Sequence, residues 1–324
     1  MAILRAVVET YIETAEPVGS AVAGRVADLD VSSATIRNEL ASLDQQGYLT
    51  QPHTSAGRVP TDKAYRAFVD DIDAPDLTRP ETQRVQDFFD QKYDEIEEML
   101  DRTSSLLSEM TGVASVVVTP DRDQATVKSV QLVELAPSVV LAVMVLSDGT
   151  VEKATIESPE AVDEVSIAIA SGHLSAAMVG RSIADSTVPS PTGNATADRL
   201  VEAARAVLSA SDVVGDLYVG GLSSLPTSFG TVETVKEVME LLEKQLVVVS
   251  LVRDVMRSDM SVAIGQETGM DPLSECSLVV APYAADDNTT GTIGLLGPTR
   301  MNYPHAMAAV AVVSQQLGKR LTEG

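Results

Sequence analysis

The spacing of apolar residues changes several times along this chain of 324 residues, and these changes limit which folds are possible. Up to about residue 112, apolar residues recur at the three- and four-residue spacing of helices. Beyond that point come β-branched runs, which favour strands and stand at 113–119, 127–135, 139–146 and 151–156. Two alanine-rich helical stretches follow, and the strand pattern returns from 213. We therefore predict an α+β multidomain fold.

Residues 1–73 are predicted to form a small winged-helix domain. Two short helices come first, and the polar run Glu13–Glu16 ends the first of them. A third helix begins after a pair of serines and ends before Gly47. Extended segments at 48–51 and 58–59 then flank a turn rich in Pro and Gly, which predicts a hairpin, and another helix follows. Helices and a hairpin in this order are typical of a winged helix-turn-helix.

The third helix would present a face that can read DNA. With Ile36, Leu40 and Leu43 turned inward, the opposite side carries Arg37, a partner for guanine or phosphate, and Asn38, a partner for adenine. Periodicity alone also fits an ordinary amphipathic surface helix. The residues that we expect to contact DNA, on this helix, on the hairpin and just after it, are Ser32, Ser33, Thr35, Arg37, Asn38, His53, Thr54, Ser55, Arg58 and Lys63.

Residues 74–112 are predicted to form a linker and one long helix. The stretch 70–80 contains two prolines and four aspartates, a composition typical of linkers. From 81 to 112 the apolar residues recur mostly at spacings of three, four or seven, which predicts an amphipathic helix. The pattern fits either a dimer seam or a helix that faces a core.

The rest of the chain is predicted to form an α/β sensor-like domain that is interrupted by an insertion. Its first part would span 113–158, where the β-branched runs should pair in one antiparallel sheet, and its second part would span 213–324. Between them, 159–212 carries alanine-rich stretches around a loop of Ser, Pro, Thr and Gly. This composition predicts a mostly helical insertion.

The charge of the chain restricts how it could bind nucleic acid. Acidic residues number 47 and basic residues 23, which gives a formal net charge of −24. Binding phosphate over the whole surface is excluded, because it needs clustered Lys or Arg. Any DNA contact must be local, and between 31 and 68 basic residues do outnumber acidic ones. The excess of acidic residues and the scarcity of lysine also resemble proteins that work at high salt, where ions screen self-repulsion.

The sequence predicts neither an enzyme nor a membrane protein. Cys276 is the single cysteine and the three histidines lie far apart, so we expect no disulfide, metal or cofactor. No Gly-x-Ser-x-Gly turn is present to hold a nucleophilic serine. The longest nearly uninterrupted apolar stretch, 139–146 with its neighbours, is about half of a membrane span, and no signal peptide is recognisable. We therefore expect a cytoplasmic protein.

Five stretches of the sequence resemble the HrcA family of heat-inducible transcription repressors. They are Glu16–Ser20, Val31–Leu40, Gly47–Asp62, Val262–Glu267 and Gly297–Tyr303. The first three are long and specific matches, and the likeness continues more loosely to the end of the chain. The resemblance therefore covers nearly the whole sequence.

The resemblance implies a function. Members of the family have an N-terminal winged helix, a GAF-like domain and an inserted dimerising domain. They bind as homodimers to double-stranded DNA at an inverted repeat upstream of chaperone genes, and a chaperonin of the GroEL type helps to keep them active. Heat or protein-folding stress releases them. The alternative is a transcription regulator that senses a small molecule through the GAF-like domain.

Overall fold

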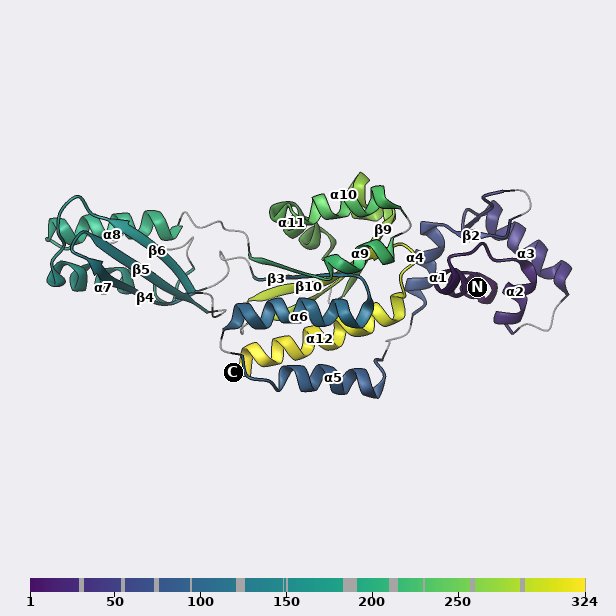
Figure 1. Cartoon of the computed structure of the whole chain (residues 1–324), viewed down its shortest axis with the longest axis horizontal. Coiled ribbons are helices and arrows are strands. Elements are labelled where there is room, and N and C mark those ends of the chain that lie inside the picture. The colour runs from purple at the N-terminus through teal and green to yellow at the C-terminus, as the bar shows by residue number, and fades with distance from the viewer. Residues whose placement is uncertain are drawn as a thin grey trace.

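Three units lie in a row along the molecule (Figure 1). The computed structural model describes residues 1–28, 32–53, 56–72, 76–93, 95–120, 126–147, 149, 151–182, 191–209, 215–229, 231–256, 260–285 and 289–323. We refer to residues 1–72 as the N-terminal unit, to 126–209 as the inserted unit, and to 76–120 with 215–323 as the central unit. The central unit lies between the other two.

The N-terminal unit is built from helices and a two-stranded ribbon. Its elements in chain order are α1 (Ala2–Thr14), α2 (Ser20–Val26), α3 (Ser33–Gln45), β1 (Leu49–Thr50), β2 (Val59–Pro60) and α4 (Asp62–Asp70). Val18, just after α1, exchanges two backbone hydrogen bonds with Arg58 beside the ribbon. Gly24 lets α2 and α3 approach closely, because a Cβ there would overlap the side chain of Ile36. This element order is the one that the sequence predicts.

The central unit is organised around an antiparallel sheet with strand order β7-β3-β10-β9-β8. Its strands are β3 (Ala114–Val118), β7 (Leu217–Gly220), β8 (Ser261–Ile264), β9 (Cys276–Ala284) and β10 (Thr290–Pro298). Helices α6 (Ile96–Thr111) and α12 (Tyr303–Glu323) cover one face, and α10 (Val232–Leu242) and α11 (Gln245–Val255) cover the other (Figure 1). Shorter elements connect them: η1 (Leu222–Ser224), α9 (Leu225–Ser228), η2 (Gly265–Thr268) and η3 (Asp271–Leu273).

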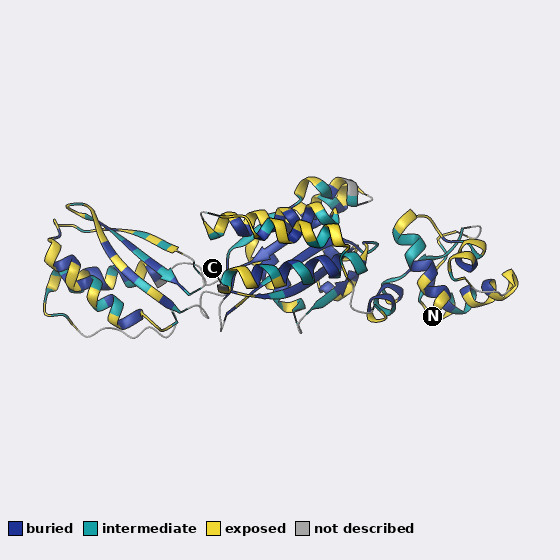
Figure 2. Cartoon of the chain, turned by 90° about the horizontal axis from the view of Figure 1, so that it is seen from below, coloured by how far each residue is buried: buried dark blue, intermediate teal, exposed yellow. Residues whose placement is uncertain are grey.

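This sheet lies between two apolar cores, one on each of its faces. Along β9, Val279 belongs to the core beneath α6 and α12, and Val280 belongs to the core beneath α10 and α11. Every residue of β3 is buried, and the sheet is the most deeply buried layer of the molecule (Figure 2). A sheet covered on both faces has continuous apolar strands, which explains the β-branched runs of this unit.

The prediction of one long helix over 81–112 is wrong. The segment forms two helices, α5 (Arg79–Phe89) and α6, and both pack against α12. Apolar spacing continues across the break because Val85, Phe89 and Met99 are buried in the same core. The core-facing alternative therefore describes these side chains.

Helix α5 is also fixed by polar contacts at its start. The hydroxyl and the N–H of Thr78 both donate to Glu81, and the Nε2 of His305 on α12 lies 2.8 Å from the same carboxylate. These contacts, with the Thr78 bonds first, lower the pKa of Glu81 to about 2. Glu81 consequently stays ionised and links α5 to α12.

The prediction of a single sheet over 113–156 is also wrong. Both helical stretches predicted within 159–212 are present, but they pack on three strands that precede them in the chain. Strands β4 (Val127–Ala136), β5 (Val139–Leu146) and β6 (Val151–Glu157) form a sheet of their own, and α7 (Glu164–Met178) and α8 (Ala195–Ser209) pack on it. Of the strands expected at 113–158, β3 alone joins the central sheet, where it pairs with the distant β7 and β10. Strand propensity does not reveal the partner of a strand, and here both partners follow the inserted unit in the chain.

The inserted unit has a core that shares no residue with the other two described cores. Leu174 of α7 is fully buried in it. We expect Leu174→Ala to lower the stability of this unit by about 2–5 kcal/mol, through lost burial and the cavity left behind. Hydrogen exchange should show reduced protection over 126–209 with α12 unchanged.

Val207→Ala provides the matched control for this substitution. Val207 lies in the same unit, on α8, but it is exposed and does not belong to this core, so the change in stability should stay within about 0.5 kcal/mol. Equal loss of protection in α12 and in the inserted unit would show that the cores do not unfold independently.

Candidate nucleic-acid interface

Helix α3 is amphipathic in the sense that the sequence predicts. Ile36, Leu40 and Leu43 are buried against α1 and α2, whereas Arg37 and Asn38 are exposed on the other side. The spacing of the three apolar residues puts them on one side of a helix, and the hydrophobic effect turns that side inward. The polar side is thereby directed to solvent.

The start of α3 is held by Ser32. Its Oγ accepts a hydrogen bond of 3.1 Å from the N–H of Thr35 and lies 2.9 Å from the Thr35 hydroxyl. This is the bonding of an N-cap residue, which satisfies an N–H that the helix itself leaves without a partner. Ser33 is exposed and lies in the first turn. Ser32 therefore caps α3, whereas Ser33 does not.

Arg37 and Asn38 are the side chains on α3 best placed to meet a ligand. Both are exposed, and no described residue forms an ion pair with Arg37. A guanidinium offers five donors in a planar fork, and an amide offers a donor and an acceptor side by side. These are the groups that pair with the edges of guanine and adenine in the major groove of DNA.

Arg58 and Lys63 occupy positions that the sequence did not predict. The Nε of Arg58 lies 3.0 Å from Asp44 Oδ2 of α3, an ion pair without the angle of a hydrogen bond, and the side chain is 18% exposed. The Nζ of Lys63 donates to the carbonyl of Gln46 at 2.9 Å and lies 4.3 Å from the centre of the Tyr48 ring. Arg58 thus connects the end of α3 to the ribbon, and Lys63 connects it to α4.

The tip of the ribbon contains the remaining predicted contacts. His53 is exposed, and its carbonyl accepts a hydrogen bond of 2.8 Å from the N–H of Ala56. Thr54 and Ser55 lie outside the described residues. The structure therefore brings Thr35, Arg37 and Asn38 together on α3 and leaves His53 on the separate ribbon.

Arg25 is a further exposed cation that the sequence argument missed. It lies in the last turn of α2, the helix that precedes α3, and no described residue forms an ion pair with it. The charge count between 31 and 68 did not reach it. Its place in the first helix of a helix-turn-helix pair was the signal that could have found it.

Comparison with known proteins identifies the family of the chain. Residues 97–307 match the family model described as the HrcA protein C-terminal domain. A heat-inducible transcription repressor HrcA from Streptomyces avermitilis is 36% identical over 332 residues, covering 99% of this chain and 97% of that protein. The chain belongs to the HrcA family.

A second HrcA relative agrees with this assignment, and a solved structure shares the fold. An HrcA repressor from Beutenbergia cavernae is 38% identical over 342 residues, covering 98% of this chain and 97% of the relative. A crystal structure described only as that of a hypothetical protein superposes with a TM-score of 0.64 at 21% identity, covering 99% and 97% of the two chains. The HrcA family thus accounts for the sequence over its whole length, and the solved structure shares the fold.

Thiol and metal chemistry find no support among the described residues. Cys276 is fully buried, and burial raises the pKa of its thiol to about 12, which keeps the thiol protonated. No cluster of three potential metal ligands is found among the described His, Cys, Asp and Glu residues. Within the described part of the chain, no helix has both the length and the apolar character of a membrane span.

The two serines at the start of α3 allow a test of its construction. We expect Ser32→Ala to destabilise α3 by about 1 kcal/mol because it removes the cap. Ser33→Ala should change stability by less than about 0.5 kcal/mol, since Ser33 lies exposed in the first turn. Hydrogen exchange of the first α3 amides measures both variants, and equal effects would contradict the assigned cap.

Proposed function

We propose that the chain is a transcriptional repressor of heat-shock genes whose N-terminal unit is a winged helix-turn-helix. The observation that carries this proposal is the exposed Arg37–Asn38 face of α3, a capped helix whose other side is buried. Its relatives bear the name heat-inducible transcription repressor. In this arrangement α3 enters the major groove, and the ribbon that carries His53 contacts the adjacent backbone.

The predicted DNA contacts, with Arg25 added to them, fall into residues that would contact DNA and residues that would position α3. Arg37 and Asn38, with Thr35, read base edges, and Arg25 and Ser33 contact phosphates. Ser32, Arg58 and Lys63 hold α3 in place through their bonds to the protein itself. Bonds of this kind fix the position of the helix, which determines the register of the base contacts.

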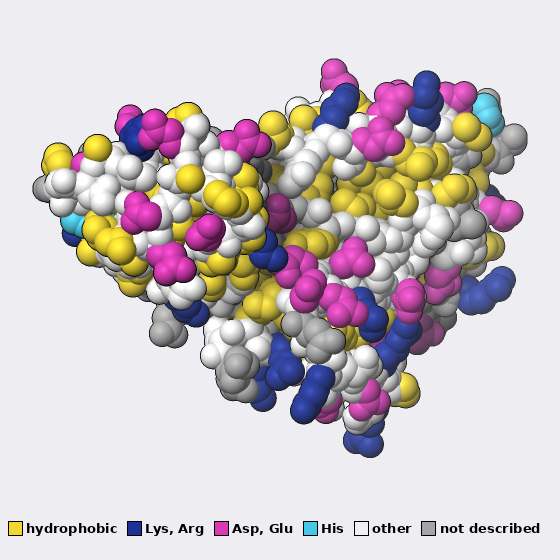
Figure 3. Space-filling model, turned by 60° about the vertical axis from the view of Figure 1, so that its left-hand side comes forward, with side chains coloured by type: hydrophobic (Ala, Val, Ile, Leu, Met, Phe, Trp, Pro, Cys, Tyr) yellow, Lys and Arg dark blue, Asp and Glu magenta, His cyan; other side chains and the backbone are white. Residues whose placement is uncertain are grey.

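We propose further that the chain binds an inverted repeat as a homodimer through the inserted unit. Strand β4 lies at the edge of its sheet and exposes Val133 and Leu135, and the neighbouring α7 exposes Val165 and Ile169. Apolar side chains are visible at the surface of this unit, the left-hand lobe in Figure 3. Exposed apolar side chains beside an open sheet edge favour association with a second copy.

The release mechanism belongs to the same proposal. Two-fold symmetry of the dimer would match the two half-sites of an inverted repeat. Heat or protein-folding stress would end repression, with a chaperonin of the GroEL type as the partner that maintains the active state. A partner of this kind is tested by adding the purified chaperonin to the DNA-binding reaction.

A second candidate is a regulator that senses a small molecule through a GAF-like central unit. A groove of about 1130 Å³ favours it; the groove lies between α11 and β8 and is lined by Leu246, Leu251 and Met260 among others. An antiparallel sheet with helices on both faces supports the GAF-like description. Metabolite-dependent thermal shifts that also change DNA affinity would favour this candidate over the bare repressor.

Base readout by Arg37 makes a quantitative prediction. Arg37→Ala should weaken binding to the inverted repeat by about 1–3 kcal/mol per half-site. It should also reduce the difference in affinity between this duplex and a scrambled duplex. A fluorescence titration across salt concentrations measures both affinities. The matched control is Arg199→Ala, which removes an exposed arginine from the inserted unit. Equal weakening on both duplexes would instead make Arg37 a phosphate contact.

The proposed dimer contact is tested by placing a charge in it. Leu135 is 58% exposed on β4, and we expect Leu135→Lys to convert the dimer to a monomer, because a buried unpaired charge is costly. Size-exclusion chromatography with light scattering measures the mass. Val232 is 80% exposed on α10 of the central unit, so Val232→Lys should leave the dimer intact. A dimer that survives Leu135→Lys places the contact elsewhere.

A further inference from the structure

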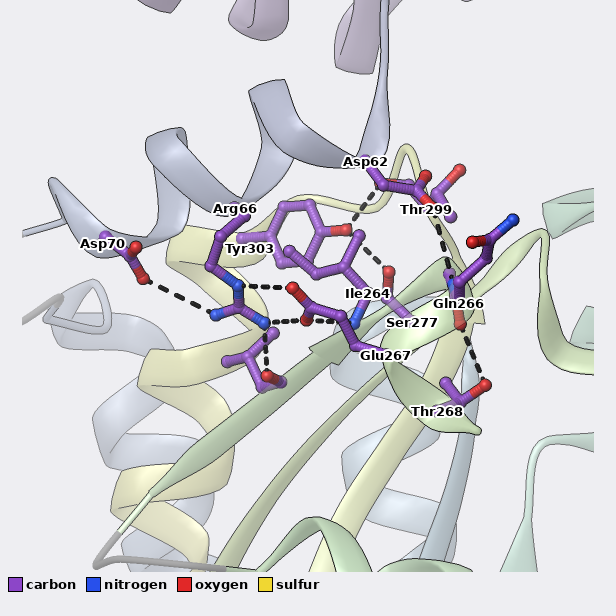
Figure 4. A network of polar contacts seen from close by, with 12 residues as sticks. Asp62, Arg66, Asp70, Ile264, Gln266, Glu267, Thr268, Ser277, Thr299 and Tyr303 are labelled. Carbon is purple, nitrogen blue, oxygen red and sulfur yellow. Dashed lines mark hydrogen bonds and ion pairs between the residues drawn. The ribbon is translucent and has the colours of Figure 1, made fainter. Parts of the chain in front are cut away.

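The N-terminal unit is joined to the central unit by a network of polar contacts around α4 (Figure 4). Three segments that lie far apart in the sequence meet there: α4, the η2 turn that follows β8, and the start of α12. They include parts of three of the stretches that carry the resemblance to the family, around Asp62, Glu267 and Tyr303. None of these residues lies on the DNA-reading face of α3.

Arg66 of α4 uses its whole guanidinium in this network. Its Nε donates to Glu267 Oε1 at 2.9 Å, and one terminal nitrogen donates both to Glu267 Oε2 and to the carbonyl of Val262, the latter at 2.6 Å. The other terminal nitrogen lies 3.5 Å from Asp70 Oδ1. A fork that binds both oxygens of a carboxylate fixes an angle as well as a distance.

Glu267 is itself held by the central unit. Its Oε2 accepts a hydrogen bond of 3.0 Å from the N–H of Ile264 at the end of β8. Burial alone would raise the pKa of Glu267, but the Arg66 hydrogen bond, the Ile264 N–H and the Arg66 charge together hold this pKa below its usual value. The carboxylate is therefore ionised and aimed at α4.

A second contact beside this pair requires a glycine. Asp62, at the start of α4, accepts a hydrogen bond of 3.4 Å from the N–H of Gln266. The preceding residue, Gly265, has a φ of +53°, and a Cβ there would overlap the Asp62 carboxylate. Any other residue would be strained at this φ and would push α4 away from the turn.

An apolar contact lies next to the polar ones. The rings of Tyr65 on α4 and Tyr303 on α12 have their centres 5.8 Å apart, and both side chains are buried. The Tyr303 hydroxyl is bonded to Ser277 and to the carbonyl of Thr299, at 2.7 Å each. Aromatic packing opposes separation of the N-terminal and central units. The directional bonds of Arg66 and Asp62 favour one rotation of the N-terminal unit relative to the central unit.

We propose that Asp62, Arg66, Gly265 and Glu267 form a latch that orients the N-terminal unit and thereby sets the half-site spacing that the dimer accepts. The proposal rests on the proposed function and names positioning residues for it. Helix α3 lies toward the outer end of the N-terminal unit, away from α4 (Figure 1), so a small rotation at the latch moves its reading face. Two rigidly held faces engage both half-sites only at a matching spacing, whereas loosely held faces tolerate several spacings with lower affinity.

The test is a titration of the full-length protein with duplexes that differ only in half-site spacing. One duplex has the inverted repeat, a second has its half-sites moved apart by about two base pairs, and a third has a single half-site. We expect the unaltered protein to prefer the first over the second by at least about tenfold, and Glu267→Gln to reduce this preference below about threefold. Affinity for the single half-site should change less than about twofold.

Matched variants separate the latch from general effects of charge and folding. Arg66→Lys keeps the charge but loses the fork, so it should act like Glu267→Gln. Glu109 pairs with Arg84 inside the central unit, and Glu109→Gln should keep the spacing preference. A spacing preference that survives Glu267→Gln and Arg66→Lys in folded protein overturns the proposal. A loss of single half-site affinity equal to the loss on the full repeat overturns it as well.

A measurement without DNA distinguishes failure of the latch from failure of the proposed function. Spin labels at Val22→Cys on α2 and Val232→Cys on α10 report the distance between the units, and the native Cys276 is too buried to be labelled. The distance distribution should be narrow in the unaltered protein and in Glu109→Gln, and broad in Glu267→Gln. Narrow distributions in all three overturn the latch, whether or not the repeat is bound. The outcome can also be split: the distribution is narrow in the unaltered protein and in Glu109→Gln and broad in Glu267→Gln, but no duplex is bound. This result supports the orienting contact. It overturns both the role of the latch in half-site spacing and the repressor function.

Discussion

Helix α4 is packed into two units at once, and this shared packing organises the molecule. Its residues Ala64, Tyr65, Phe68 and Val69 are buried in a core that continues from α1 to the end of α12. Burial of apolar surface is favourable by about 25 cal/mol per Å², so separating the units would expose apolar surface on both sides. Partly exposed ion pairs such as Arg66 with Glu267 add little stability alone. Where a buried contact already holds the units together, however, the geometry of such a pair favours one orientation of the N-terminal unit relative to the central unit.

The inserted unit is stabilised independently, because its core is separate from the other two described cores. Leu174, Met144 and Leu208 pack together without a described contribution from the central sheet. Such a unit can associate with a second copy while the core around α4 stays unchanged. The proposed dimer contact and the proposed DNA contact thus lie at opposite ends of the molecule, and the central unit determines their relative positions (Figure 1).

Local signals in the sequence predicted helix α3 and its buried side correctly, whereas the contacts of the neighbouring cations needed the structure. The spacing of Ile36, Leu40 and Leu43 decides which side of α3 is buried, and a serine before the first turn predicts a cap. Arg58 and Lys63 were predicted as DNA contacts. Their partners, Asp44 and the Gln46 carbonyl, lie 14 and 17 residues away in the chain, and no local pattern indicates those pairings.

The sequence alone determined the positions of most helices and strands, the buried side of α3, and the family resemblance, because these depend on residues close together in the chain. Strand pairing was decided in three dimensions: β3 joins β7 and β10, while β4 to β6 form a separate sheet. The latch was decided there too, since Arg66 and Glu267 are 201 residues apart. Propensity is a local property, whereas the choice of partner depends on which surfaces the whole chain must bury.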